Sequence, residues 1–170
     1  MFPKLPNLNI PSFEAKIKHL ENSSDKLLDN SLNKQTQKYQ IFDIIRKKWF
    51  LLTPEEWVRQ HVIHFLLSQN YSKNLMQIES EHHFQERKKR TDILIFDKNG
   101  SPFLVVECKA AHIALSSTVF SQVAVYNYCI DAPFVMITNG MQLCVFEKEI
   151  NKDSTSNSYK VIKELPVFGN

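Results

Sequence analysis

The stretch RTDILIFDKNGSPFLVVECKA, residues 90–110, constrains the fold more than any other part of the chain. Two apolar segments flank an Asn-Gly pair, and this pattern is the strongest short-range signal for a β-hairpin. Yet Asp92 opens the first segment, and Glu107 and Lys109 end the second. Charged side chains are seldom buried unless they are paired or bind a metal. The presence of three charged residues in this apolar hairpin therefore requires an explanation.

The turn fixes which residues face each other. With a two-residue turn at Asn99–Gly100, the numbers of facing residues sum to 199, which places Asp92 opposite Glu107. Directly opposed side chains have Cβ atoms about 4.5–5.5 Å apart. Lys109 then lies on the same face, because side chains alternate along a strand. A four-residue loop keeps this register, whereas a three-residue loop breaks it.

Two carboxylates held this close repel each other unless a cation lies between them. Mg²⁺, with Mn²⁺ as a substitute, suits the pair because it takes oxygen ligands, needs few carboxylates and keeps several waters. Lys109 could orient or deprotonate a water, or stabilise charge on a phosphate. These residues predict metal-assisted phosphodiester hydrolysis. The alternative is a solvated strand end, with Glu107 and Lys109 as a same-face ion pair.

Composition narrows the class of protein. With 170 residues, 43% of them apolar and 23% charged, the chain is expected to form one soluble globular domain. Its three glycines cannot build a P-loop or a dinucleotide-binding loop. We expect a cytoplasmic protein with no membrane partner, because no apolar run approaches about 20 residues and the start lacks a secretory signal. The cysteines are expected to be reduced core residues: Cys108, Cys129 and Cys144.

The remaining elements follow from periodicity and capping. A helix is predicted from Thr53, as N-cap, to about Gln69, and a second over 116–130, with Phe120, Val123, Ala124 and Tyr128 toward the core. Strands are expected in NLMQIESE, near 91–97 and 103–109, and in a second Asn-Gly hairpin, APFVMITNGMQLCVFEKE, while HHFQERKK reads as a polar connection. The second helix makes its flanking strands parallel, and helices should cover both faces of the sheet.

Three segments are expected. Residues 1–52 form an N-terminal extension with accessory strands, including a strand pair with a turn near Arg46–Lys48. Residues 53–150 form an α/β core in the order helix, three strands, helix, strand, strand, and residues 151–170 form a C-terminal tail.

Asp92 followed by Glu107-Cys108-Lys109 resembles the signature of the PD-(D/E)xK nuclease superfamily, and the element order is similar to its restriction-endonuclease-like core. Together with TPEEWVRQHVIHFLL and FSQVAVYN, it resembles the N-terminal nuclease domain of type I restriction enzyme R subunits over roughly residues 40–148. The resemblance implies a Mg²⁺-dependent DNA endonuclease in which Asp92, Glu107 and the Cys108 carbonyl bind the metal and Lys109 is catalytic.

The resemblance also implies auxiliary residues. Gln122 and Tyr126 match a Gln-x-x-x-Tyr helix motif that accompanies this site, and their alternative role is a polar helix edge. Glu56 is the candidate first-helix metal ligand, although it could simply complete the capping box with Thr53. The basic run Arg87, Lys88, Lys89 and Arg90 could bind DNA phosphates, or form a solvated loop. Glu79 could border the site or face water.

Three functions stay open at this point. The first is a restriction-type nuclease module whose partners are DNA, other restriction-system subunits or a separate ATP-dependent motor. The second is a catalytically silent module that binds nucleic acid or docks on a restriction subunit. The third is a structural protein with ion-paired strand ends.

Overall fold

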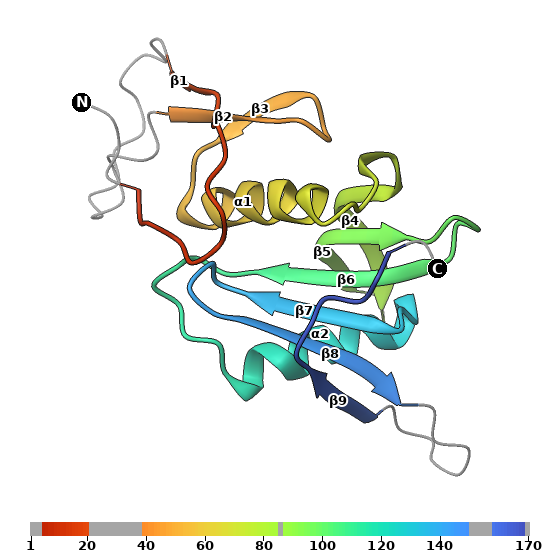
Figure 1. Cartoon of the computed structure of the whole chain (residues 1–170). Helices are drawn as coiled ribbons and strands as arrows, with labels where there is room; N and C mark the ends of the chain where they lie inside the picture. Colours follow the sequence, from red (N-terminus) through yellow and green to blue (C-terminus); the bar gives the residue numbers. More distant parts are fainter. Residues whose placement is uncertain (1–4, 21–38, 85–86, 150–157, 169–170) are drawn as a thin grey trace.

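The computed structural model describes residues 5–20, 39–84, 87–149 and 158–168. Figure 1 shows their arrangement in layers: a small N-terminal sheet lies over helix α1 (Pro54–Ser68), α1 lies over the main sheet, and α2 (Ser117–Ile130) lies on the other side of that sheet. In the described part of the chain, no helix is both long and apolar enough to cross a membrane.

The main sheet is mixed and has six strands in the order β4-β5-β6-β7-β8-β9. Helix α2 connects β6 to β7, and these two strands are parallel, as predicted, while the other neighbours are antiparallel. The strands are β4 (Met76–Phe84), β5 (Arg87–Phe96), β6 (Pro102–Cys108), β7 (Phe134–Thr138), β8 (Leu143–Glu149) and β9 (Ser158–Ile162), and a short 3₁₀ helix, η2 (Lys73–Leu75), precedes β4.

Helices cover both faces of this sheet. Thr53 caps α1, because its hydroxyl accepts the backbone N–H of Glu56 at 3.0 Å. The apolar residues of α1 pack with the even-numbered residues of β6, whereas those of α2 pack with Val105 on the opposite face. Phe103, the second residue of β6, is half-buried. The prediction that Tyr128 of α2 faces the core is wrong, since 63% of its surface is exposed.

The β4–β5 connection differs from the prediction. The segment expected to be a polar connection instead extends both strands, with pairing that continues from Glu81↔Arg90 to Phe84↔Arg87. Polar residues do not prevent this, because a ladder satisfies backbone N–H and C=O groups whatever the side chains are. The pairing is interrupted at Glu79, whose backbone takes a left-handed conformation with φ of 54°.

The β5–β6 turn reaches the predicted register by another route. The backbone of Asp97 donates to the Ser101 carbonyl at 2.8 Å, so the loop between them has three residues rather than two or four. A bulge between Ile95 and Phe96 inserts one extra residue in β6. Beyond it, Ile93 faces Val106, which restores the sum of 199. Gly100 has φ of 82°, as the turn requires.

The N-terminal segment forms the expected accessory sheet. Its three antiparallel strands are β1 (Ile17–His19), β2 (Tyr39–Asp43) and β3 (Lys48–Leu51). An extended arm before β1 reaches the β7–β8 turn, where the Asn9 backbone N–H donates to the Gly140 carbonyl at 2.8 Å. A Cβ added at Gly140 would lie 2.9 Å from the Leu8 side chain. The arm is therefore seated against the second Asn-Gly turn.

The three cysteines form no disulfide with one another in the structure. They are not all core residues, however. Cys108 is buried, Cys144 is partly buried and Cys129 is exposed on α2.

Candidate active site

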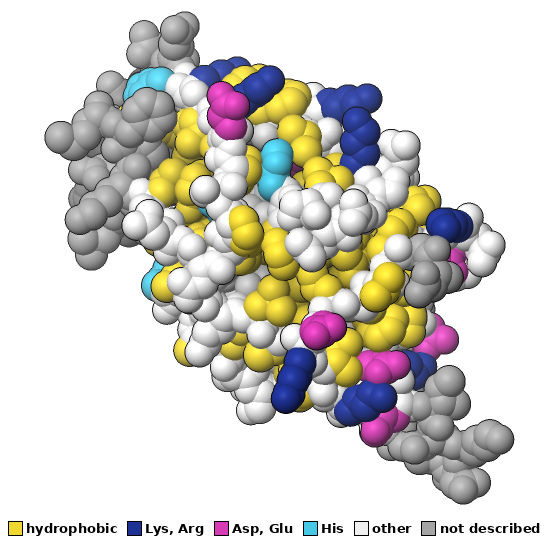
Figure 2. Space-filling view, in the orientation of Figure 1, with side chains coloured by type: hydrophobic (Ala, Val, Ile, Leu, Met, Phe, Trp, Pro, Cys, Tyr) yellow, Lys and Arg dark blue, Asp and Glu magenta, His cyan; other side chains and the backbone are white. Residues whose placement is uncertain are grey.

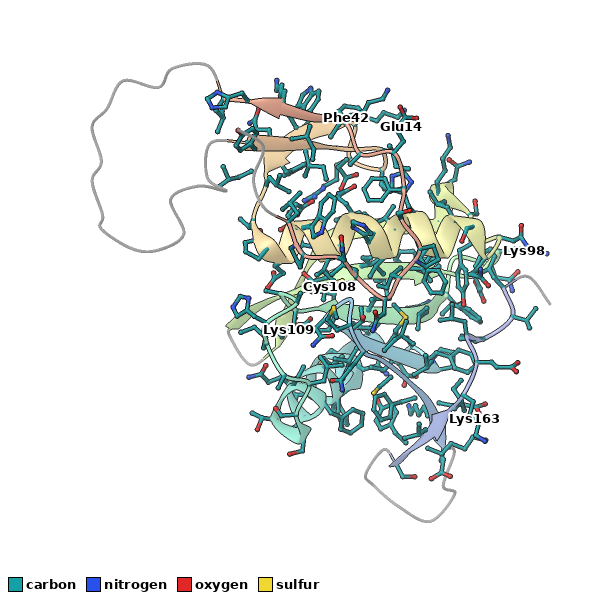
Figure 3. All side chains as sticks on the ribbon, turned by 60° about the vertical axis from the view of Figure 1, so that its left-hand side comes forward. Glu14, Phe42, Lys98, Cys108, Lys109 and Lys163 are labelled. Carbon is teal, nitrogen blue, oxygen red and sulfur yellow. The ribbon has the colours of Figure 1, made fainter. Side chains whose placement is uncertain are left out.

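The candidate site lies where β5 begins to pair with the end of β6. Continuation of the observed register places Asp92 opposite Glu107, and both residues are buried. Lys109 follows β6 and its Nζ donates to Glu107 Oε1 at 2.6 Å. Figure 3 shows Cys108 and Lys109 close together on the side of α1 that faces the main sheet. The hairpin thus brings together the two carboxylates and the lysine that the sequence singled out.

Asp92 is held on both of its carboxylate oxygens. Its Oδ2 accepts the backbone N–H of Cys108 at 2.6 Å, and its Oδ1 accepts Nη2 of Arg59 at 2.5 Å. The first bond fixes Asp92 to the neighbouring strand, and the second fixes it to α1. Arg59 is buried. Although burial alone would lower the pKa of the Arg59 guanidinium, the adjacent Asp92 and Glu56 raise it, so that Arg59 is always charged.

The second carboxylate is incompletely neutralised. Burial and the charge of Asp92 raise the pKa of Glu107 to about 7, although the hydrogen bond from Lys109 opposes this shift. Burial tends to lower the pKa of Lys109, but its hydrogen bond and attraction to Glu107 outweigh that effect and raise it. Lys109 is therefore an ammonium ion at neutral pH. Glu107 titrates near neutrality and would be fully ionised beside a further cation.

A second ionic cluster, centred on Arg46, lies beside the cluster of Asp92, Glu107 and Lys109. It joins the N-terminal sheet to α1. Arg46, on the β2–β3 turn, donates Nε to Asp43 at 2.7 Å, Nη1 to Glu79 at 2.6 Å and Nη2 to Glu56 at 2.5 Å. Its guanidinium stacks 3.3 Å from the centroid of the Phe50 ring. Each donor group of this arginine therefore has an acidic partner, and its flat face is covered.

The two clusters share Glu56 and Arg59. Glu56 Oε2 accepts Nη1 of Arg59, whose Nη2 binds Asp92, and Glu56 Oε1 accepts Arg46 and the Gln60 amide. Arg59 also lies 3.7 Å from Glu79. Opposite charges alternate along this path from the N-terminal sheet to the strand end.

The two glutamates at the start of α1 occupy different positions. Glu56, the predicted first-helix ligand, is occupied by Arg46, Arg59 and Gln60, and these contacts also replace the carboxylate half of the predicted capping box. Glu55 is more exposed and 3.2 Å from Arg59. Burial and the charge of Asp92 raise the pKa of Glu55, and the charges of Arg59 and Lys109 partly offset the shift. Glu55 is thus the first-helix carboxylate that senses the charges of the site.

The predicted auxiliary residues are not tested by contacts at the site, because the structure gives only their exposure or their backbone position. Gln122 is exposed on α2, and the structure does not describe the side chain of Tyr126. The backbone of Arg87, Lys88, Lys89 and Arg90 belongs to β5, but their side chains are likewise outside the described part.

The end of β7 supports the site from the other side. The backbone N–H of Lys109 donates to the Thr138 carbonyl at 2.8 Å, which continues the parallel pairing beyond β6. The Asn139 side chain donates to the Ile113 carbonyl at 2.8 Å and accepts two backbone N–H groups of its own turn. The second Asn-Gly turn therefore anchors the loop that follows Lys109.

The donor set limits the kind of metal site. Among the residues that the structure describes, no three His, Cys, Asp or Glu side chains gather closely enough to hold a metal by themselves. Two facing carboxylates remain, Asp92 and Glu107, and the ring-nitrogen and thiolate ligands typical of zinc are missing from this pair. Mg²⁺ binds through one or two carboxylates and keeps several waters. The pair therefore fits Mg²⁺ and not a closed structural zinc site.

Sequence reasoning missed the two arginines of the site. Arg59 stands three and four residues after Glu56 and Glu55, a spacing that brings side chains together on a helix. That spacing could have identified it as an ionic partner, but not its bond to Asp92. Arg46 follows Asp43 in a turn, and its contacts with α1 and β4 depend on tertiary structure.

Comparison with known proteins gives one family. The family model described as type I restriction enzyme R protein N terminus matches residues 54–166, which include α1, the main sheet, α2 and all of Asp92, Glu107 and Lys109. A search of curated proteins found no match.

Proposed function

The chain belongs to the family of type I restriction enzyme R protein N-terminal domains, and on that premise we propose that it is a Mg²⁺-dependent endonuclease module that hydrolyses DNA phosphodiester bonds. The observation that carries the proposal is the buried, facing pair Asp92 and Glu107 with Lys109 bonded to it. We propose further that the helix–sheet–helix core corresponds to the PD-(D/E)xK nuclease fold.

In this proposal, Asp92, Glu107 and the Cys108 carbonyl hold Mg²⁺. When bound by these residues, Mg²⁺ would supply Lewis-acid polarisation of the phosphodiester and activation of a water nucleophile. Asp92 is positioned for this by the Cys108 N–H and by Arg59, since both bonds fix its rotamer. Glu55 and Asp92 both contact Arg59 Nη2, at 3.2 Å and 2.5 Å, and we propose Glu55 as the first-helix carboxylate that would assist in holding the ion.

Lys109 acts as a charged group in this mechanism. Its pKa is raised by Glu107, so at neutral pH it holds its proton and is no base. It therefore orients the attacking water or stabilises the negative charge that develops on the phosphate, and it can donate a proton to the leaving oxygen. The Thr138 carbonyl fixes its backbone while the side chain stays bonded to Glu107.

Two substitutions separate the proposed roles. Asp92→Ala removes one of two side-chain anions for the ion, so Mn²⁺ binding by calorimetry and plasmid nicking should both be lost. Lys109→Ala keeps both carboxylates, so Mn²⁺ should still bind while nicking falls by about 10²–10⁴-fold. Lys163→Ala, at an exposed lysine away from the site, is the matched control and should behave as wild type.

The outcomes also distinguish the catalytically silent module. Mn²⁺ binding without nicking in the wild-type chain would favour a binding module, or a nuclease that needs a restriction-system partner or motor. Mn²⁺ affinity that Asp92→Ala leaves unchanged would reject this site as the metal site.

A further inference from the structure

The outer face of the N-terminal sheet takes no part in the proposed cleavage site. Its register places Lys18, Gln40 and Leu51 in one row across the three strands. The next row holds Phe42 facing Trp49, and the Phe42 N–H donates to the Lys16 carbonyl, which places Lys16 beside them. These rows define the outer face. It lies outside residues 54–166, the part that matches the family.

Side chains alternate along each strand of this sheet, so the residues between those of the outer face point to the buried face. Ile41 and Asp43 of β2 are fully buried toward α1, whereas Trp49 and Leu51 of β3 are 37% and 42% exposed. Large apolar side chains exposed next to one another are unusual on a protein that has nothing to bind there. Figure 2 shows lysine and arginine side chains along its upper margin, over β1–β3, with hydrophobic side chains between them.

The lysines interleave with the aromatic rings. Lys18 Nζ lies 4.5 Å from the centroid of the Trp49 ring, and Lys16 Nζ lies 6.0 Å from that of Phe42. The two rings meet edge to face, with centroids 5.4 Å apart. Lys47 is exposed on the adjoining turn, and Glu14 is the acidic residue near the end of the face. Among the residues of this face that the structure describes, positive charges therefore outnumber negative ones around the two rings.

We propose that this outer face binds single-stranded DNA, with bases stacking on Trp49 and Phe42 and phosphates paired with Lys16 and Lys18. Proteins that bind single strands combine a basic surface with aromatic side chains, because every base presents a flat π-face and every nucleotide a phosphate. Duplex DNA buries those faces, so rings on an open sheet favour an unpaired strand. Phosphates would draw the two ammonium groups off the rings that they cover in the free protein.

The arrangement connects this face with the proposed cleavage site. The β2–β3 turn that borders the face carries Arg46, which binds Glu56 on α1 and Glu79 on β4. Figure 3 shows Phe42 in the N-terminal sheet, with α1 between it and Lys109. The sheet is thus fixed to the core by ion pairs, and a strand bound there would be held at a constant position relative to the site. This role extends the proposed nuclease function.

The test is fluorescence anisotropy with labelled oligothymidylate, measured without divalent metal. Lys16→Glu with Lys18→Glu, and separately Trp49→Ala, should each weaken binding by about 10-fold or more, since stacking and phosphate contacts contribute at this scale. The matched control, Lys98→Glu with Lys163→Glu, changes the net charge equally at exposed lysines elsewhere and should leave the affinity within about twofold of wild type. Lys16, Lys18 and Trp49 are exposed, and circular dichroism checks that the variants fold.

Three results would overturn the proposal. Equal weakening by the control pair would mean that only net charge matters. Equal affinity for a duplex would exclude base stacking, and binding of anionic lipid vesicles in place of the oligonucleotide, lost in Trp49→Ala, would assign the face to a membrane. Asp92→Ala should bind the oligonucleotide as wild type does, so failure of the nuclease proposal and failure of this one give different results.

Discussion

The two ionic clusters of this chain both pair carboxylates with cationic side chains, but they differ in which cations hold the carboxylates. Around Arg46, the carboxylates of Asp43, Glu56 and Glu79 each receive arginine donors within the protein. At the strand end, burial and the neighbouring Asp92 keep the pKa of Glu107 near 7 despite Lys109. We call the cluster around Arg46 closed, because each of its carboxylates accepts a guanidinium donor and the cluster joins two sheets. We call the cluster at the strand end open, because Glu107 accepts the partly exposed Lys109 ammonium instead and a further cation would favour its ionised form. Buried charge alone does not distinguish the two clusters, whereas the raised pKa of Glu107 makes the strand end the candidate functional site.

The largest effect on stability is expected in the closed cluster. Arg46→Ala leaves Asp43 buried without its arginine and Glu56 with Arg59 alone, which should lower the free energy of unfolding by about 3–5 kcal/mol. Urea denaturation followed by circular dichroism measures this loss. Lys48→Ala, at an exposed position two residues away, should stay within about 0.5 kcal/mol of wild type. A small loss for Arg46→Ala would show that the cluster is a solvated surface network instead.

The open cluster should instead make stability depend on pH. Because the pKa of Glu107 is raised from 4.5 to about 7, its proton stabilises the folded state at low pH, and this stabilisation is lost as pH rises through about 7. The loss should be on the order of 2–3 kcal/mol between about pH 5 and pH 8. Glu107→Gln cannot titrate, so it should lack this component.

Subtracting the stability of Glu107→Gln from that of wild type at each pH also cancels the contributions of other titrating groups. Burial lowers the pKa of His61 and of His64, which adds a component of opposite sign: stability lost as pH falls. Both histidines are present in both proteins, so they cancel in the difference between the two unfolding curves. Parallel curves for the two proteins would contradict an under-neutralised Glu107, and added Mg²⁺ should recover stability at high pH only in wild type.

The smallest effect on stability should come from Lys109→Ala. Its ammonium is partly exposed, so the ion pair with Glu107 contributes less than about 1 kcal/mol to folding. The same variant is expected to lose most plasmid nicking, and thus to separate function from stability in a way that Arg46→Ala cannot. A thermal melt alongside the nicking assay checks this. A loss of several kcal/mol would assign Lys109 to structure.

The hairpin that carries the site was predicted from the sequence, although the predicted length of its turn was wrong. Alternation and the Asn-Gly turn predicted that Asp92 faces Glu107, and the observed register agrees. The turn itself has three residues, and the bulge opposite Phe96 compensates for it. A bulge has no sequence signal as distinct as Asn-Gly, because it depends on how the strand packs.

Contacts between elements far apart in sequence were not predictable in this way. The pattern Thr53–Glu56 suggested a capping box, but only the hydroxyl half forms. The Glu56 carboxylate binds Arg46 and Arg59 instead, because bonds to guanidinium groups are stronger than one to a backbone N–H. A single sequence gives no register between a turn and a helix, so neither arginine could be placed at the site.

The N-terminal arm and sheet change what counts as the folding unit. The family match begins at residue 54, yet Ile41 and Leu52 are fully buried and Leu8 closes against Gly140. A polypeptide trimmed to the matched boundary would expose the α1 surface that these residues cover and leave Glu56 and Glu79 without Arg46. The part of the chain that the family model matches is therefore shorter than the part that must fold together. The residues before position 54 pack against the matched part as a separate subunit would.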